Sequence, residues 1–178
     1  KMNSKSIKPE ELRYLRLLAR QSPTVQAAST EIINLQSILN LPKGCEHFIS
    51  DVHGEYEAFQ HILNSCSGVV REKLDALYAN TLPRAELDAL ATLIYYPEEK
   101  LEQIRKTTED MGEWYRIALH RLIEICRSIS NRYTRSKVRK ALPAEYAYVI
   151  DELLNTQGEV TDKKDYFENI IATIIEID

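Results

Sequence analysis

The sequence is short of the residues that mark several classes of protein. Its 178 residues include only five glycines and six prolines, which are few for the many turns of an all-β fold. Its three cysteines, Cys45, Cys66 and Cys126, are odd in number and widely spaced. They therefore form neither a disulfide framework nor a Cys-x-x-Cys zinc pattern, and we expect reduced thiols in the cytosol.

Long apolar runs and a strong excess of one charge are also missing. No apolar run approaches 18 residues and no signal-peptide pattern begins the chain, so we predict a soluble, cytoplasmic protein with no membrane partner. The 27 acidic and 23 basic residues leave a net charge of −4, which gives no overall case for nucleic-acid binding. The apolar content of 44% is enough for the core of one domain.

Most of the chain has the spacing of three and four residues that is typical of amphipathic helices. The second expected helix has the most regular seam, formed by Val25, Ala28, Ile32, Leu35 and Leu39. The expected helices begin at Pro9 and at 22–23, cover 56–63, 70–78, 84–95, 98–106 and 111–129, and begin again at Pro143 and at about Asp162.

One segment departs from this helical pattern. An apolar run predicts a strand at about 45–51, and the sequence Asp51-Val52-His53-Gly54-Glu55 follows. In an extended segment alternate residues point to the same side, so Asp51 and His53 can reach one metal ion where the strand ends. Gly54 permits a sharp turn. Glu55 suits either the orientation of a ligand or the first turn of a helix.

The metal site is unfinished within this sequence, because catalytic centres usually need at least three protein ligands. An Asp-x-His triplet also arises by chance, and an aspartate after a strand is often only a helix cap. Among the other histidines, His47 is about 20 Å from His53 along an unbroken strand. His61 and His120 lie in helical patterns, where His120 and Glu124 share a face.

Several strings in the chain have no reason to occur together by chance. The segment 48–59, Phe-Ile-Ser-Asp-Val-His-Gly-Glu-Tyr-Glu-Ala-Phe, resembles the first signature of the calcineurin-like metallophosphoesterases, Asp-x-His-Gly. More narrowly, the chain resembles the class III fructose-1,6-bisphosphatases of Firmicutes-type bacteria from about Tyr14 to Ile175. The strings that carry this resemblance are 31–35, 39–44, 95–98, 113–115 and 133–143.

The resemblance implies a Mn²⁺-dependent hydrolase that removes the 1-phosphate of fructose 1,6-bisphosphate in gluconeogenesis and leaves fructose 6-phosphate. It implies that Asp51 and His53 bind one ion of a two-metal centre that activates water, with Gly54 and Glu55 beside these ligands. The family's later ligand motifs are absent from the sequence. We therefore expect the N-terminal part of a longer enzyme, inactive by itself.

The expected fold is predominantly α, with the strand at about 45–51 as the first strand of an α/β metallophosphoesterase sandwich that downstream sequence completes. The expected divisions are a helical segment at 1–43, a strand-loop-helix unit at 44–68 and a helical insertion or cap at 69–178. The edges of a lone strand would invite pairing with a second copy, which leaves a homo-oligomer open.

A cluster of basic residues suits a bisphosphate or another anion, because guanidinium groups make paired contacts to phosphate. The alternative, a solvated helix end paired with nearby carboxylates, is the stronger interpretation. The cluster comprises Arg127, Arg132, Arg135, Lys137, Arg139 and Lys140.

Two other functions stay open at this stage. One is a calcineurin-like phosphoesterase that acts on a different substrate. The other is a helical interaction or oligomerisation module without a metal site, in which the seam from Val25 to Leu39 governs self-association.

Overall fold

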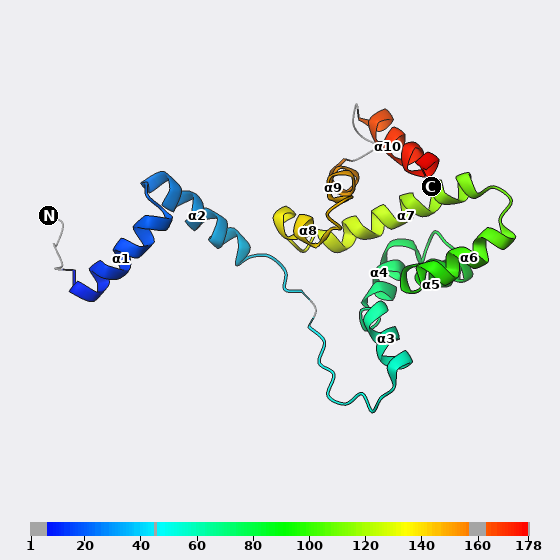
Figure 1. The fold of residues 1–178 in the computed structure, drawn as a ribbon, viewed down its shortest axis with the longest axis horizontal. Helices are drawn as coiled ribbons and strands as arrows, with labels where there is room; N and C mark the ends of the chain where they lie inside the picture. Colours follow the sequence, from blue (N-terminus) through cyan, green and yellow to red (C-terminus); the bar gives the residue numbers. More distant parts are fainter. Residues whose placement is uncertain (1–6, 45, 157–162, 178) are drawn as a thin grey trace. The chain divides into compact units, whose positions relative to one another are not determined.

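The computed structural model describes residues 7–44, 46–156 and 163–177, and this part of the chain is helical throughout its regular structure (Figure 1). The helices are α1 (Pro9–Gln21), α2 (Val25–Ile38), α3 (Tyr56–Asn64), α4 (Val69–Tyr78), α5 (Arg84–Tyr95), α6 (Pro97–Thr107), α7 (Met111–Ser130), α8 (Arg135–Ala141), α9 (Ala147–Asn155) and α10 (Lys164–Ile177).

The chain divides into two units, Lys1–Lys43 and Gly44–Asp178. The first unit contains α1 and α2. Pro9 opens α1 and two glutamates occupy its first turn, where they face the positive end of the helix dipole. Helix α2 begins after Thr24, whose hydroxyl oxygen accepts a hydrogen bond from the Ala27 amide at 3.1 Å. Neither helix contains a buried residue.

In the second unit, α4, α5 and α7 share the larger core. Leu74 of α4 is fully buried at its centre. Tyr78 is also buried, and its hydroxyl donates to Glu124 Oε2 of α7 at 2.6 Å. The buried members of this core are Val70, Leu74, Tyr78, Leu87, Leu90, Ala91, Leu93, Ala118 and Ile125.

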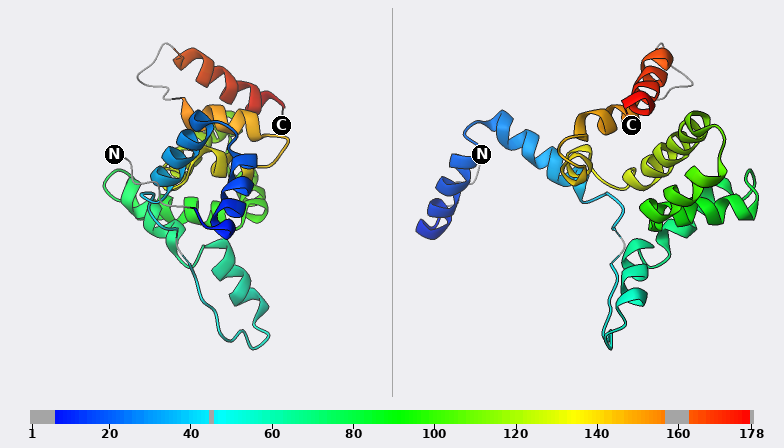
Figure 2. Two further views of the ribbon diagram at one scale, coloured as in Figure 1. Left: turned by 90° about the vertical axis from the view of Figure 1, so that its left-hand side faces the viewer. Right: turned by 45° about the vertical axis from the view of Figure 1, so that its right-hand side comes forward.

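Helix α7 is apolar on two faces because it also forms a second core with α9 and α10. Ala118 and Ile125 face the first core, whereas Ile123 packs with Leu153, Phe167 and Ile171 in the second. Figure 2 shows α7 between the two groups of helices. A helix apolar on two faces is typical of the interior of a helical domain.

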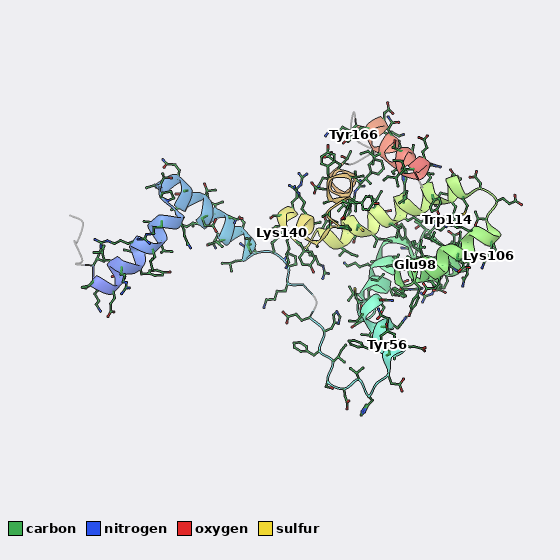
Figure 3. The ribbon with its side chains drawn as sticks, viewed as in Figure 1. Tyr56, Glu98, Lys106, Trp114, Lys140 and Tyr166 are labelled. Atoms are coloured by element: carbon green, nitrogen blue, oxygen red, sulfur yellow. The ribbon has the colours of Figure 1, made fainter. Side chains whose placement is uncertain are left out.

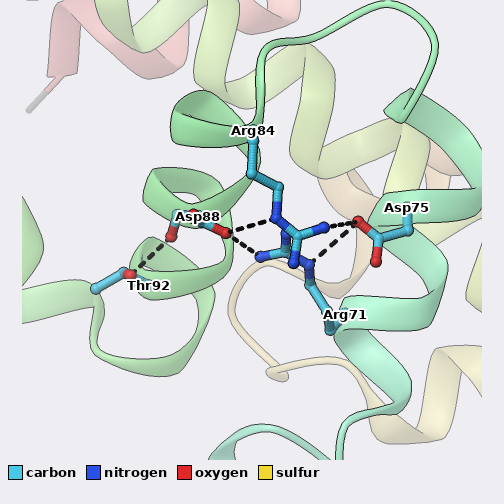
Figure 4. A network of polar contacts seen from close by, with 5 residues as sticks. All are labelled: Arg71, Asp75, Arg84, Asp88 and Thr92. Carbon is cyan, nitrogen blue, oxygen red and sulfur yellow. Dashed lines mark hydrogen bonds and ion pairs between the residues drawn. The ribbon is translucent and has the colours of Figure 1, made fainter.

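A neutral group of charges ties α4 to α5 (Figure 4). Arg71 of α4 contacts Asp75 Oδ1 with Nε at 3.1 Å and Asp88 Oδ1 of α5 with Nη1 at 2.5 Å. Arg84 lies 3.5 Å from each of the same two carboxylates. Because two arginines and two aspartates cancel, this group stabilises the helix pair without attracting an anion.

Helix α3 is held to the end of α5 by polar contacts. Asn64 Nδ2 donates to the Tyr95 carbonyl at 2.8 Å, and His61 Nδ1 lies 2.8 Å from the Tyr96 hydroxyl. Between α3 and α4 the backbone makes a left-handed turn, with positive φ at Cys66, Ser67 and Gly68.

The prediction of a predominantly α fold is confirmed, and every expected helix forms in the described residues. Helix α9 begins at Ala147, four residues after the proline expected to open it, and the expected beginning at Asp162 lies outside the described residues. Helix α8 was not expected, and its signal was Thr134, whose hydroxyl accepts from the Lys137 amide.

The strand expected at about 45–51 does not form in the described part of this segment, where residues 46–52 have no regular structure. Cys45, the first residue of that prediction, lies outside the described residues. A strand needs a neighbour to bond its amides and carbonyls, and the described ranges contain no second strand. None of their helices has both the length and the apolar content needed to cross a bilayer.

Candidate metal centre

The Asp-x-His-Gly motif forms a tight turn between the irregular segment 46–51 and α3. The Glu55 amide donates to the Val52 carbonyl at 2.9 Å, and φ is 49° at His53 and 77° at Gly54. Positive φ at both central residues defines a type I′ turn, which favours glycine at the second of them. Histidine is one of the few residues with a side chain that adopt this conformation with some frequency.

The turn brings the two predicted ligands together by a different route from the one expected. An extended segment was to place Asp51 and His53 on one side; instead the reversal of the chain at His53 brings its Nε2 to 2.8 Å from Asp51 Oδ2. Both side chains are open to solvent, with exposed fractions of 64% for Asp51 and 79% for His53. An external ligand can therefore approach both.

The donor atoms fit two neighbouring positions of a metal ion. Two ligands about 2.1 Å from one ion and about 90° apart are separated by about 3.0 Å, close to the distance between Asp51 and His53. A carboxylate oxygen and an imidazole nitrogen are acceptable to Mn²⁺. Within the described ranges no three His, Cys, Asp or Glu side chains gather for a metal, and a catalytic centre built on this pair would need further ligands.

Gly54 and Glu55 shape the exit from the turn. No atom outside the neighbouring residues lies within 4 Å of the position that a Cβ would take on Gly54, so its role is conformational. The Tyr56 amide donates to the Gly54 carbonyl at 2.9 Å. Glu55 lies between these two residues and is the N-cap residue of α3. The Glu55 side chain makes no capping hydrogen bond, and its role beside the ligands stays a prediction.

His61 and His120 have partners outside this turn. His61 contacts Tyr96, and His120 of α7 lies 3.3 Å from Glu168 of α10 and stacks on Phe167. Glu124, which shares a helix face with His120, accepts instead from a buried tyrosine. Sequence reasoning missed these partners because they come from helices more than 30 residues away along the chain.

Within the basic cluster, Arg127 and Arg135 contact residues of α9 and its C-terminal end. Arg135 contacts Asp151 of α9 with Nη2 at 2.7 Å and Nε at 3.3 Å, and Asp151 is buried. The hydrogen bond that Arg135 donates to Asp151 lowers the pKa of the Asp151 carboxyl. Arg127 donates to the carbonyls of Leu153, Leu154 and Thr156.

The other basic residues lie in α8 or shortly before it. Lys137 lies over the ring of Tyr133, with 4.9 Å between Nζ and the ring centre. Arg139 acts electrostatically on Asp151, and Lys140 lies at the end of α8 (Figure 3). This arrangement favours the structural interpretation for Arg127 and Arg135, and anion binding by Arg132, Lys137, Arg139 and Lys140 stays a prediction.

Comparison with known proteins identifies the family to which this chain belongs. The family described as Firmicute fructose-1,6-bisphosphatase matches residues 13–178. The chain belongs to this family. The matched range includes the Asp51–His53 turn, all of α2 and both helical cores.

Individual members of the Firmicute fructose-1,6-bisphosphatase family are similar over nearly the whole chain. The fructose-1,6-bisphosphatase class 3 of Clostridium botulinum (strain Loch Maree / Type A3) is 56% identical over 176 residues, and that of Clostridium acetobutylicum is 57% identical over 169 residues. These matches cover 99% and 95% of this chain but 26% and 25% of the relatives. The chain thus spans about a quarter of their length. No solved structure matches it.

Proposed function

We propose that the chain is part of a metal-dependent phosphatase that hydrolyses the 1-phosphate of fructose 1,6-bisphosphate to fructose 6-phosphate and inorganic phosphate. The single observation that carries this proposal is the family match over residues 13–178, which includes two adjacent metal donors on one turn. In the proposal, Asp51 and His53 hold one Mn²⁺ ion of a two-metal centre, and the longer protein supplies the remaining ligands.

In this proposal, the role of Asp51 and His53 is to position one metal ion. Asp51 contributes a negative oxygen, His53 a neutral nitrogen, and the turn at Gly54 holds them 2.8 Å apart. When bound, divalent cations supply the Lewis acidity that makes water a nucleophile and offsets charge on the phosphoryl group. Water adds to phosphorus, the bond between phosphorus and the sugar oxygen breaks, and that oxygen leaves with a proton.

The finer fold assignment belongs to the same proposal. In the longer protein, the segment at about 45–51 would be a strand of the α/β metallophosphoesterase sandwich, because another strand would bond the backbone groups that residues 46–51 leave without regular structure here. The donors would then lie at the carboxyl end of that strand, the usual place for sites in α/β folds. A cytoplasmic location and self-association stay predictions.

The test uses the longer protein that carries this chain, with Mn²⁺ present or removed by a chelator. We expect release of inorganic phosphate from fructose 1,6-bisphosphate only with the metal. Loss of a group that merely supports a metal ligand typically costs 10- to 100-fold in affinity or activity. Asp51→Ala and His53→Ala should each therefore lower phosphate release at least about 100-fold.

His47→Ala is the matched control, because it removes an imidazole from the exposed segment before the turn. It should stay within about twofold of the parent protein. Full activity in the chelator, or in the Asp51 and His53 variants, would contradict the proposal. Metal-dependent hydrolysis of other phosphoesters without that of fructose 1,6-bisphosphate would retain the metal site and reject the substrate.

A further inference from the structure

Helix α2 has an apolar face that nothing in its own unit covers. Ile32, Leu35 and Leu39 are exposed by 64%, 52% and 78%. With about 100° between successive residues, they and Val25 lie within about 80° of helix surface, and Ala28 lies among them. A continuous apolar stripe of this kind normally packs against another element.

The rest of α2 also indicates burial, because its polar residues are almost all uncharged. Glu31 is the only charged residue of the 14 in the helix. It lies one turn from both Ala28 and Leu35, at the edge of the apolar face. The positions from which a lysine or arginine could pair with it inside α2 hold Ala27, Ala28, Asn34 and Leu35 instead, so the helix supplies no counter-charge.

This charge argues against a second copy of the helix as the cover. Glu31 lies near the middle of α2, and in a two-fold symmetric pair of helices the two copies of a central residue meet. Two carboxylates would then face each other at the edge of an apolar contact. Like charges placed together in an interface are unfavourable. An apolar surface with a positive side chain opposite Glu31 would complement both features of the face.

A membrane surface is also a poor match. Helices that lie on membranes usually carry lysine and arginine on the polar face, and α2 has neither. The relatives, in contrast, are about four times as long as this chain, and α2 lies entirely within the range that the family shares. Proteins of this family therefore contain polypeptide beyond the part that this chain matches.

We propose that the α2 face formed by Val25, Ala28, Ile32, Leu35 and Leu39 docks on the remaining part of the longer protein, at an apolar surface with a lysine or arginine opposite Glu31. The docking holds the helical segment that precedes the metal turn. It uses none of the donors of the proposed phosphatase site, so its test is independent of activity.

The apolar part is tested by amide hydrogen exchange of α2 in the longer protein. Leu35→Asp places a charge in the face, whereas Asn34→Asp adds the same charge outside it. We expect Leu35→Asp to speed exchange of the α2 amides at least tenfold and Asn34→Asp to leave it within about twofold. Fast exchange of α2 in the parent protein, or equal effects of the two variants, would overturn the proposal.

The proposed positive side chain opposite Glu31 is tested with variants that leave the apolar face intact. Glu31→Lys reverses the charge, and Thr30→Lys adds a lysine on the far side of the helix. Exchange should become at least fivefold faster only in Glu31→Lys.

Sedimentation of the 178-residue chain distinguishes the proposed docking from the alternative, in which a second copy of the chain covers the α2 face. A monomer whose state does not change in Glu31→Gln supports the proposal. A dimer that Glu31→Gln strengthens, because it removes carboxylate repulsion, would overturn it in favour of a second copy.

Discussion

Helices α2 and α7 are both amphipathic, yet only α7 has its apolar residues buried. Ala118, Ile123 and Ile125 of α7 belong to two cores, whereas α2 has no buried residue. The more charged helix is the buried one, since α7 carries five acidic or arginine side chains and α2 carries one. Periodicity thus defines the face that a helix can bury, and burial itself depends on which partners the chain contains.

The same contrast separates a first region, helices α1 to α3, from a second region, helices α4 to α10. Helices α1, α2 and α3 contain no buried residue, although leucines and isoleucines recur along all three. From α4 onward, residues 70–171 include every buried member of the two cores. Stability of this chain should therefore reside in the second region, and changes in the first should have little effect on it.

The largest difference is expected between two leucines. Leu74→Ala removes a fully buried side chain and should lower the free energy of unfolding by about 2–5 kcal/mol. Leu35→Ala makes the same change on α2 and should stay within about 0.5 kcal/mol. Urea unfolding of the 178-residue chain measures both. Equal losses would show that α2 is packed in this chain and would break the comparison.

The next effect concerns the buried carboxylate of α9. Arg135→Ala leaves Asp151 with only the Asn155 amide at 3.0 Å. Loss of a hydrogen bond from a charged group at a buried site should cost about 1.5–3 kcal/mol. Lys140→Ala on the same helix is the control, with an expected change below about 0.5 kcal/mol. A loss in Lys140→Ala as large as that in Arg135→Ala would contradict the assignment.

The pH dependence of that pair has a definite sign. Because the hydrogen bond from Arg135 lowers the pKa of Asp151 in the folded chain, its stabilisation is complete above the ordinary aspartate pKa of about 3.9 and is lost as the pH falls through the lower, folded value. Unfolding curves between pH 7 and pH 2 should show the difference between the parent chain and Arg135→Ala shrinking only below about pH 4. A difference that shrinks already between pH 7 and 5 would point to another group.

Two glycines provide a smaller test of the same contrast. Gly54 and Gly68 both have positive φ, and no other atoms crowd either one. An alanine in this conformation is strained by about 1–2 kcal/mol. Gly68→Ala should show this loss, because Gly68 joins α3 to the core helix α4. Gly54→Ala lies before the core and should change global unfolding by less than about 0.5 kcal/mol.

The smallest effect is expected at a buried hydroxyl. Tyr78→Phe removes the hydrogen bond to Glu124 and should cost about 0.5–1.5 kcal/mol. Tyr56→Phe, an exposed control, should be neutral. Burial and the bond to Glu124 raise the pKa of Tyr78, so the parent chain should lose stability as the pH rises above about 10, where the unfolded tyrosine ionises. Tyr78→Phe should lack that part of the loss.

The helices could be predicted from the sequence because their signals are local. Pro9, Thr24, Asp110 and Thr134 begin or cap helices within a few residues of themselves. The strand at 45–51 could not be settled in this way, because a strand depends on partners distant in the sequence. The apolar run in this segment indicates burial, but it does not identify the part of the protein that would pack against the segment.

The two candidate metal donors are also indicated by a local signal, whereas their geometry could not be predicted from it. Asp51 and His53 are close to each other, but through a type I′ turn at His53 and Gly54 and not through an extended segment. The ion pair of Arg135 could not be predicted from the sequence for a different reason. Asp151, the partner of Arg135, lies 16 residues away on another helix, and only the packing of α8 against α9 brings the two together.

Hydrogen exchange of the unchanged sequence, in the 178-residue chain and in the longer protein, tests most directly whether α2 lacks a partner that the longer protein provides. The account predicts that the α7 amides exchange slowly in both. The α2 amides at 25–38 should exchange quickly in the 178-residue chain and at least about tenfold more slowly in the longer protein. Equal exchange of α2 in the two proteins would contradict the account.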